Sequence, residues 1–167
     1  MLNSIDTAAV IRDGGAVGQF PGEIHEGVAW WIAACLVVTT KASRIAVAHD
    51  GHNTSVGFYD RLCRGAGNAQ HYACRVTDVG VADQDELLAA MKDLGSVPGI
   101  RVTTTAAPEG ETVHIAVYDD QGFPLTEDAG LAMIRRLIAE DRVPIPVNAQ
   151  AKGYVEPYKV IAEEAAQ

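Results

Sequence analysis

The stretch RIAVAHDGHNTS, residues 44–55, decides the fold class of this chain. Residues 44–49 form a short apolar run with β-branched side chains, which predicts a buried strand. The polar residues 50–55 predict a loop at the carboxyl end of that strand, and the apolar residues Phe58, Leu62 and Cys63 predict a helix over 56–69. A buried strand that leads into a helix is the repeating unit of α/β proteins.

The rest of the chain continues this alternation. Further strands are predicted over residues 72–79, 99–104 and 112–118, and further helices over 24–38, 83–94, 127–141 and 157–166. Residues 12–22, RDGGAVGQFPG, are predicted to form a loop because they include four glycines and a proline. Residues 143–153, VPIPVNAQAKG, are too rich in proline for a helix. The order of elements predicts a three-layer α/β/α sandwich whose mixed sheet is mostly parallel, with one antiparallel addition.

The composition narrows the class of protein. With 167 residues, 48% of them hydrophobic, the chain is long and apolar enough to fold as one domain with a sizeable core. Its 13 basic and 22 acidic residues give a net charge of −9, which argues against binding to nucleic acid or to an anionic membrane. The longest apolar run, residues 28–38, is too short to span a bilayer, since about 20 residues are needed.

The cysteines and the N-terminus indicate the compartment. Cys35, Cys63 and Cys74 are odd in number and scattered, with no CxxC motif, which is typical of neither a disulfide framework nor a zinc site. The N-terminal residues lack the basic segment and long apolar run of a signal peptide. A cytoplasmic protein is therefore expected.

No residue pattern in the chain identifies a reaction by itself. The sequence has no P-loop, GxGxxG, HExxH or GxSxG motif. His49 and His52 flank Asp50 at a predicted strand end, but no third ligand lies nearby, so no metal site is predicted. Ligands usually bind at the carboxyl ends of strands in such folds, which draws attention to loops 50–55 and 103–110.

The run Thr103, Thr104 and Thr105 has two interpretations. Their hydroxyls follow a predicted strand and could receive a phosphoryl group or cap a helix. Alternatively, they are ordinary β-branched strand residues that end at the turn of Pro108. The residues alone predict a soluble acidic α/β domain with a site at the strand ends.

Five segments, in order, resemble the first domain of the phosphohexomutase family, which includes phosphoglucomutase and phosphomannomutase. PGEI (21–24) is similar to the segment after the family's DIRG loop, VAHDGHNTS (47–55) to VGRDGRxSS, DVGVADQDEL (78–87) to DxGxxPTPEL, GIRVTTTAAP (99–108) to GxMITASHNP, and IAVYDDQGFPL (115–125) to FKVYxxDGxPL. The resemblance runs from about residue 14 to 136. It implies a domain-I-like unit over residues 1–143, and a linker and C-terminal helix over 144–167 that resemble the start of the family's second domain.

The resemblance also implies a site, and the chain departs from the family's residues there. Thr105 falls on the phosphoserine position, and the implied ligand-binding candidates are Asp50, His52, Ser55, Thr103 and Thr104. The family's Asp and Arg of DIRG fall on Gly15 and Val17, its His and Asn after the phosphoserine on Ala106 and Ala107, its Lys on Ala116, and an Arg on His52. Loss of one donor to the transferring oxygens costs on the order of 3–4 kcal/mol, so loss of several should abolish mutase activity.

We therefore expect a non-catalytic phosphohexomutase-like protein that acts through a protein partner, self-association as a homo-oligomer, or regulation in carbohydrate metabolism. One alternative is a phosphosugar-binding remnant with residual activity as an intramolecular phosphotransferase, an isomerase of the phosphomannomutase type. Only that alternative would use Mg²⁺, and the chain has no run like the family's DGDxDR; no other cofactor is expected. Another alternative is a fragment of a longer mutase.

Overall fold

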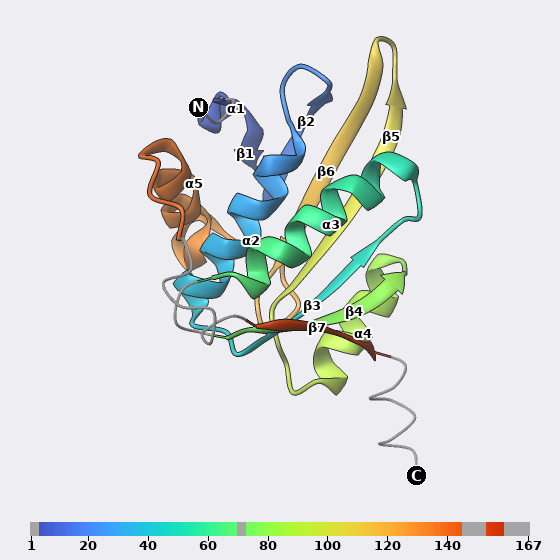
Figure 1. Ribbon diagram of the computed structural model, residues 1–167, viewed down its shortest axis with the longest axis vertical. Coiled ribbons are helices and arrows are strands. Elements are labelled where there is room, and N and C mark those ends of the chain that lie inside the picture. Colours follow the sequence, from blue (N-terminus) through green and yellow to red (C-terminus); the bar gives the residue numbers. More distant parts are fainter. Residues whose placement is uncertain (1–3, 70–72, 145–152, 159–167) are drawn as a thin grey trace.

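The computed structural model describes residues 4–69, 73–144 and 153–158, and within them the strands form a single sheet (Figure 1). The strands are β1 (Ile11–Arg12), β2 (Gly15–Phe20), β3 (Arg44–His49), β4 (Arg75–Val81), β5 (Gly99–Ala107), β6 (Gly110–Tyr118) and β7 (Tyr154–Pro157). The helices are α1 (Thr7–Val10), α2 (Glu26–Thr40), α3 (Asn53–Gly67), α4 (Gln84–Asp93), the π-helical turn η1 (Glu127–Leu131) and α5 (Ala132–Ala139).

The sheet is mixed, with the strand order β1-β2-β6-β5-β3-β4-β7. The pairs β1–β2, β2–β6 and β6–β5 are antiparallel, whereas β5–β3, β3–β4 and β4–β7 are parallel. The predicted α/β class with a mixed sheet is confirmed. The expectation of a mostly parallel sheet with one antiparallel addition is wrong in its proportions, because half of the pairings are antiparallel.

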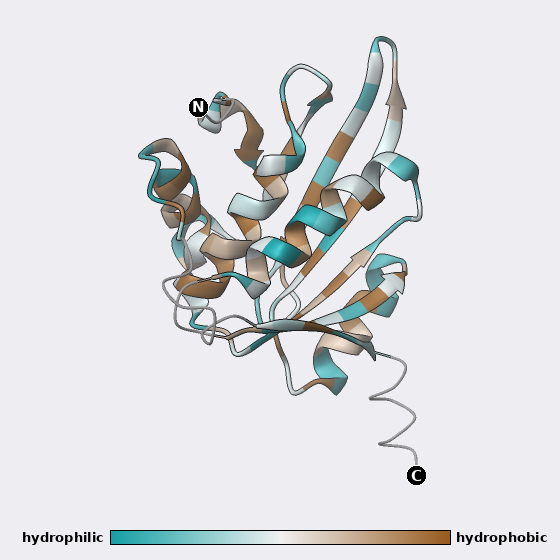
Figure 2. Ribbon diagram, in the orientation of Figure 1, coloured by the Kyte–Doolittle hydropathy of each residue, from teal (hydrophilic) through white to brown (hydrophobic). Residues whose placement is uncertain are grey.

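Helices cover the two faces of the sheet unequally (Figure 1). On one face, α2, α3 and α5 share the larger apolar core with the sheet. Helix α2 is buried on nearly all sides, as its apolar sequence predicts. On the other face, α4 packs through Leu87 and Met91 on Ala46 and Ala48 of β3 and on Tyr118. Hydrophilic and hydrophobic residues alternate along β6 (Figure 2), and its buried residues Val113, Ile115 and Val117 belong to the larger core.

Residues 12–22, predicted to be a loop, form most of an antiparallel hairpin. Asp13 and Gly14 both have positive φ, 53° and 77°, as a tight two-residue hairpin turn requires. A Cβ on Gly15 would lie 1.9 Å from the carbonyl oxygen of Ile115, so glycine is required where β2 approaches β6. The glycines that suggested a loop therefore make the turn and the close strand pairing possible.

The prediction of a loop over residues 103–110 is also wrong. Strand β5 continues through Ala107 and pairs with β6 along its full length. The threonine run lies within this ladder, in agreement with the interpretation of these residues as strand. The positions that looked like loop ligands are therefore fixed on alternate faces of a hairpin.

The predicted helices are found with shifted ends. Helix α2 corresponds to the helix predicted over 24–38 but is shifted by two residues toward the C-terminus. Helix α4 begins after Asp83, whose side chain forms a capping box with Glu86. Helix α3 begins at Asn53 rather than 56, because the His52 imidazole caps it. The helix predicted over 127–141 is interrupted at Gly130, where φ is 156°. No helix among the described residues has both the length and the apolar character needed to cross a membrane.

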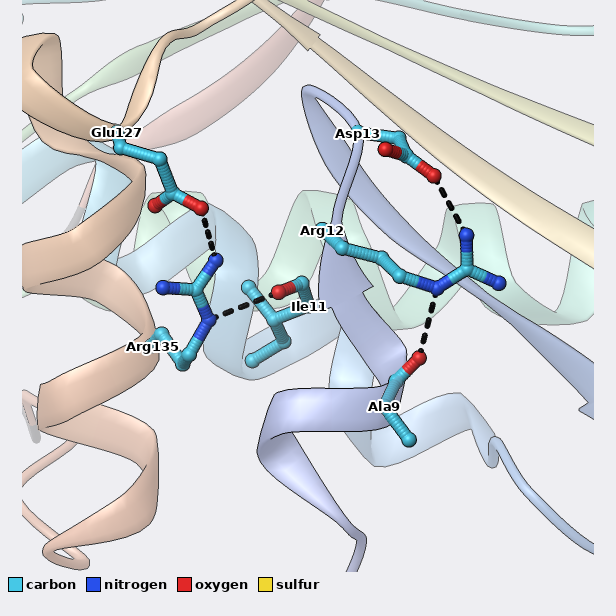
Figure 3. Close-up of polar contacts among 6 residues, drawn as sticks. All are labelled: Ala9, Ile11, Arg12, Asp13, Glu127 and Arg135. Carbon is cyan, nitrogen blue, oxygen red and sulfur yellow. Dashed lines mark hydrogen bonds and ion pairs between the residues drawn. The ribbon is translucent and has the colours of Figure 1, made fainter.

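The two sheet edges are held by ionic contacts. At the β1 edge, Arg135 of α5 donates from Nε to the carbonyl oxygen of Ile11 at 2.8 Å and pairs with Glu127 (Figure 3). At the β7 edge, the Glu156 carboxylate pairs with Arg44 and Arg75, each at 3.1 Å. The strand predicted over 72–79 is β4, whereas residue 72 and most of the helix predicted over 157–166 lie outside the described residues; Pro157 itself belongs to β7.

Candidate functional site

The structure brings four of the predicted ligand residues together where β3 ends and α3 begins. One oxygen of the Asp50 carboxylate accepts from the backbone N–H of Thr104 at 2.8 Å, and the other accepts from that of His52 at 3.0 Å. The hydroxyls of Ser55 and Thr104, both buried, lie 2.6 Å apart. We call Asp50, His52, Thr54, Ser55, Thr104 and Glu111 the strand-end network.

Glu111 is the residue of this network that the sequence did not reveal. Its carboxylate accepts from the Thr54 hydroxyl at 2.6 Å and lies 3.0 Å from His52 Nε2. Since His52 Nδ1 accepts from the Thr54 N–H at 3.1 Å, the imidazole proton belongs on Nε2, from which it donates to Glu111. Glu111 comes from β6, 57 residues after Thr54, and only the β5–β6 register places it beside α3.

The hydrogen bonds of the network stabilise Asp50 as a carboxylate. Desolvation by partial burial raises the pKa of Asp50, but the hydrogen bonds from Thr104, His52 and Ser55 lower it, and the net shift is downward. Both carboxylate oxygens are occupied by backbone donors. The network is therefore arranged to fix the β3–α3 corner and the β5–β6 hairpin, with Asp50 as an acceptor rather than a proton donor.

Thr103 and Thr105 lie on the opposite face of the sheet from Thr104, because side chains alternate along a strand. Directly opposed residues of β5, β6 and β2 form three rows on that face: Thr105, Thr112 and Gln19; Thr103, His114 and Val17; Arg101, Ala116 and Gly15. We call these nine residues the open face. Thr105 is exposed, and Thr103 is half-buried. The predicted site is therefore divided between two faces of the sheet.

The open face also collects three of the positions at which the chain departs from the family pattern. Val17 lies in the row of Thr103, and Gly15 and Ala116 lie in the row of Arg101, on the same face as Thr105. Ala106 pairs with Glu111 on the side of α3, and Ala107 pairs with Gly110 at the end of the hairpin. Arg101 is the arginine of these rows, and it lies four positions along the strand from Thr105, a distance of about 13 Å.

His114, at the centre of the open face, is predicted to be neutral at pH 7. Desolvation lowers its pKa, Asp13 raises it and Arg12 lowers it, with a net downward shift. We expect its NMR titration midpoint to lie below about 6.5, the usual value for histidine. Because the unfolded chain then binds the proton more readily, protonation removes stability as the pH falls below about 6.5. The imidazole resonance of His114 is identified by its absence from the spectrum of His114→Gln. A titration midpoint above 6.5 would contradict the prediction.

The cysteine thiols and the side chains that could bind a metal are the other chemical groups of interest among the described residues. Burial raises the pKa of the thiols of Cys35, Cys63 and Cys74 to about 12, so none is a thiolate at neutral pH. Within the described ranges, histidine, cysteine and acidic side chains form no group of three that could hold a metal ion.

Comparison with known proteins places this arrangement in a family. Residues 11–143 match domain I, the alpha/beta/alpha domain, of phosphoglucomutase/phosphomannomutase. A phosphomannomutase from Klebsiella pneumoniae is 28% identical over 146 residues, which are 87% of this chain and 90% of that protein. The phosphomannomutase of Escherichia coli is also 28% identical over 146 residues, but they are only 31% of its length.

A solved structure agrees on the fold. The crystal structure of a phosphoglucomutase/phosphomannomutase family protein from Burkholderia thailandensis superposes with a TM-score of 0.70 and 19% identity, over 96% of this chain and 35% of that one. The chain thus spans about a third of the length of the longer relatives. With the match over residues 11–143 and the shared fold, this chain belongs to the phosphoglucomutase/phosphomannomutase family and carries its domain I.

Proposed function

We propose that this domain does not catalyse phosphoryl transfer through its own residues and that it acts by contact with another polypeptide. The observation that carries the proposal is the composition of the open face as a whole: of its nine residues, Arg101 alone is a lysine or arginine, and it lies four positions from Thr105 along β5. At Val17 and Ala116, where the family pattern has Arg and Lys, the face presents an isopropyl group and a methyl group.

Electrostatics explains why this composition is unsuited to the reaction. The transferring phosphoryl group carries negative charge on its oxygens, and catalysis depends on cations and donors fixed around it. Arg101 is about 13 Å along the strand from Thr105. Glu111 and Asp50 add negative charge at the same end of the sheet, where both are engaged in the strand-end network.

The shape of the open face supports contact with a polypeptide. Val17, His114 and Ala116 are half-buried, and among the described helices only the short α4 packs on this side of the sheet, against β3 and β5 and against the end of β6 at Ala116 and Tyr118. A broad sheet face with apolar and polar side chains is suited to another protein layer. Membership of this family supports a proposed role in carbohydrate metabolism, and three free cysteines are compatible with the proposed location in the reducing cytoplasm.

A mutase assay tests the catalytic part of the proposal. The purified chain is incubated with glucose 1,6-bisphosphate, Mg²⁺ and glucose 1-phosphate or mannose 1-phosphate, and both turnover and intact mass are followed. We expect an unmodified mass and a rate equal to that of Thr105→Val, purified in the same way as the matched control. Thr105 is exposed, so this nearly isosteric change leaves the fold intact. Turnover that Thr105→Val abolishes, or a phosphate on Thr105, would overturn the proposal.

A further inference from the structure

We propose that the open face binds a second copy of this chain, with Arg101 of each copy paired to Asp13 of the other. The inference rests on the proposed function, of which it names the partner. Four observations carry it: a half-buried arginine without a carboxylate partner among the described residues, a well exposed carboxylate on the same side of the sheet, two small residues between them, and the breadth of the face.

Arg101 differs from the other half-buried arginines. Arg44 and Arg135, whose side chains are 21% and 26% exposed, each pair with a carboxylate. Arg101 donates from Nε to the carbonyl oxygen of Ala82 at 2.7 Å, and its terminal amino groups have no acidic partner among the described residues. In a chain with nine more acidic than basic residues, a half-buried guanidinium without a carboxylate is a binding group for an acid from outside.

Asp13 provides such an acid at the other border of the face. It lies in the β1–β2 turn, its side chain is 71% exposed, and among the described residues its carboxylate pairs only with the neighbouring Arg12 (Figure 3). Arg12 lies opposite Gly15 on the side of the sheet away from the core residue Ile11, so its ion pair with Asp13 places that carboxylate at the border of the open face. A carboxylate accepts several hydrogen bonds, so Asp13 can bind a second guanidinium without releasing Arg12.

The register of the sheet gives the two groups matching positions. Arg12, Gly15, Ala116 and Arg101 are directly opposed on four successive strands. A two-fold axis that runs along the strands, above the line between Gly15 and Ala116, therefore places Arg101 of one copy opposite the Arg12–Asp13 pair of the other, within reach of the Asp13 carboxylate, and the reverse contact forms by symmetry. Gly15 and Ala116 are the smallest residues of the face, so they let the two sheets approach closely.

The face suits a protein surface better than an enclosed small molecule. Cavities of about 440 and 390 Å³ lie elsewhere, at the amino end of β3 beside Ser43 and beside Trp31 under α1 and α5. Four strands about 4.8 Å apart and a nine-residue strand give a face of roughly 14 by 30 Å. That area is at the small end of specific interfaces, so we expect micromolar rather than nanomolar association.

Sedimentation velocity over a range of micromolar concentrations tests the inference. We expect the wild-type chain to shift from monomer to dimer as concentration rises. Arg101→Glu should raise the dissociation constant about a hundredfold, because each dimer loses two ion pairs and gains two repulsive ones. Arg61→Glu is the matched control: it makes the same charge change at an exposed arginine on α3, across the sheet, and should leave association unchanged.

Two further variants separate a lost contact from a lost fold. Asp13→Asn, in the exposed turn, should also weaken the dimer, because it removes the negative charge that binds Arg101. The fold should be kept, since asparagine tolerates the positive φ of this position. Arg101→Glu combined with Asp13→Lys should restore association by exchanging the charges; Lys41 shows that lysine adopts this backbone conformation here.

A monomer at every concentration, or Arg101→Glu and Arg61→Glu with equal effect, would overturn the inference. Neither outcome bears on catalysis. The mutase assay alone decides the catalytic part of the proposed function, so the two can fail separately.

Discussion

Phe58→Ala is expected to lower the free energy of unfolding by about 4 kcal/mol. The Phe58 ring lies on α3, has no exposed surface, and meets the Phe20 ring edge-on with centroids 5.3 Å apart. Truncation removes a large apolar side chain and an aromatic pair, and leaves a cavity where the β2 end, α3 and the sheet meet. Urea denaturation followed by circular dichroism measures the change as a lower midpoint at constant slope.

Val56→Ala provides the matched control for this prediction. Val56 lies two residues earlier on the same helix, and 45% of its surface is exposed. The substitution removes little buried apolar area, and alanine has a higher helix propensity than valine. The free energy of unfolding should therefore change by no more than about 0.5 kcal/mol. Equal effects of the two substitutions would show that the packing of α3 is not as described.

Asp50→Asn is expected to cost about 2–3 kcal/mol at pH 7. The carboxylate accepts the backbone N–H groups of Thr104 and His52, so it connects β5 to the start of α3. An asparagine of the same shape has only one oxygen, and its amide nitrogen would face one of the two N–H donors. Hydrogen bonds to charged acceptors are the stronger class, and the loss leaves a partly buried donor unpaired.

The effect of Asp50→Asn should depend on pH. The folded-state pKa of Asp50 is lower than its usual value near 3.9, so the stabilisation is complete above the unfolded-state pKa and is lost as the pH falls through the folded-state pKa. Unfolding free energies of wild type and variant, measured at neutral and at strongly acidic pH, should converge in acid. A constant difference would contradict the assignment, and Asp120→Asn, in an exposed turn, should show no such convergence.

The alternation of strands and helices could be predicted because each element carries a local signal. The run 44–49 is apolar and short enough to be a strand, and the acidic first turn of α4 follows an N-cap aspartate. These signals depend on neighbours within a few residues. They specify which elements form and, through the strand–helix order, the parallel half of the sheet.

The antiparallel half could not be predicted in the same way. Its ladder joins β2 to β6 across about a hundred residues, and the glycines that permit this pairing look like loop residues in the sequence. The Asp13-Gly14 pair is a hairpin signal that could have corrected the assignment. Continuation of β5 to Ala107 depends on the partner strand rather than on its own residues.

The candidate site was predicted in part. Asp50, His52, Ser55 and Thr104 meet as expected from their places at the strand end, whereas Thr105 points to the other face. The distinction follows from strand period, which could be applied only once the threonines were known to be strand. Glu111 carries no sequence signal, because its partners His52 and Thr54 are distant in the chain.

The pairing of β2 with β6 also affects how the chain folds as it leaves the ribosome. Residues 15–20 leave the ribosome about a hundred residues before their partner residues 111–116. At translation rates of 5–20 residues per second, the nascent β2 segment waits roughly 5–20 s before it can pair. Arg135, which donates to the carbonyl oxygen of Ile11, is made later still, so residues 11–20 stay available to chaperones during this interval.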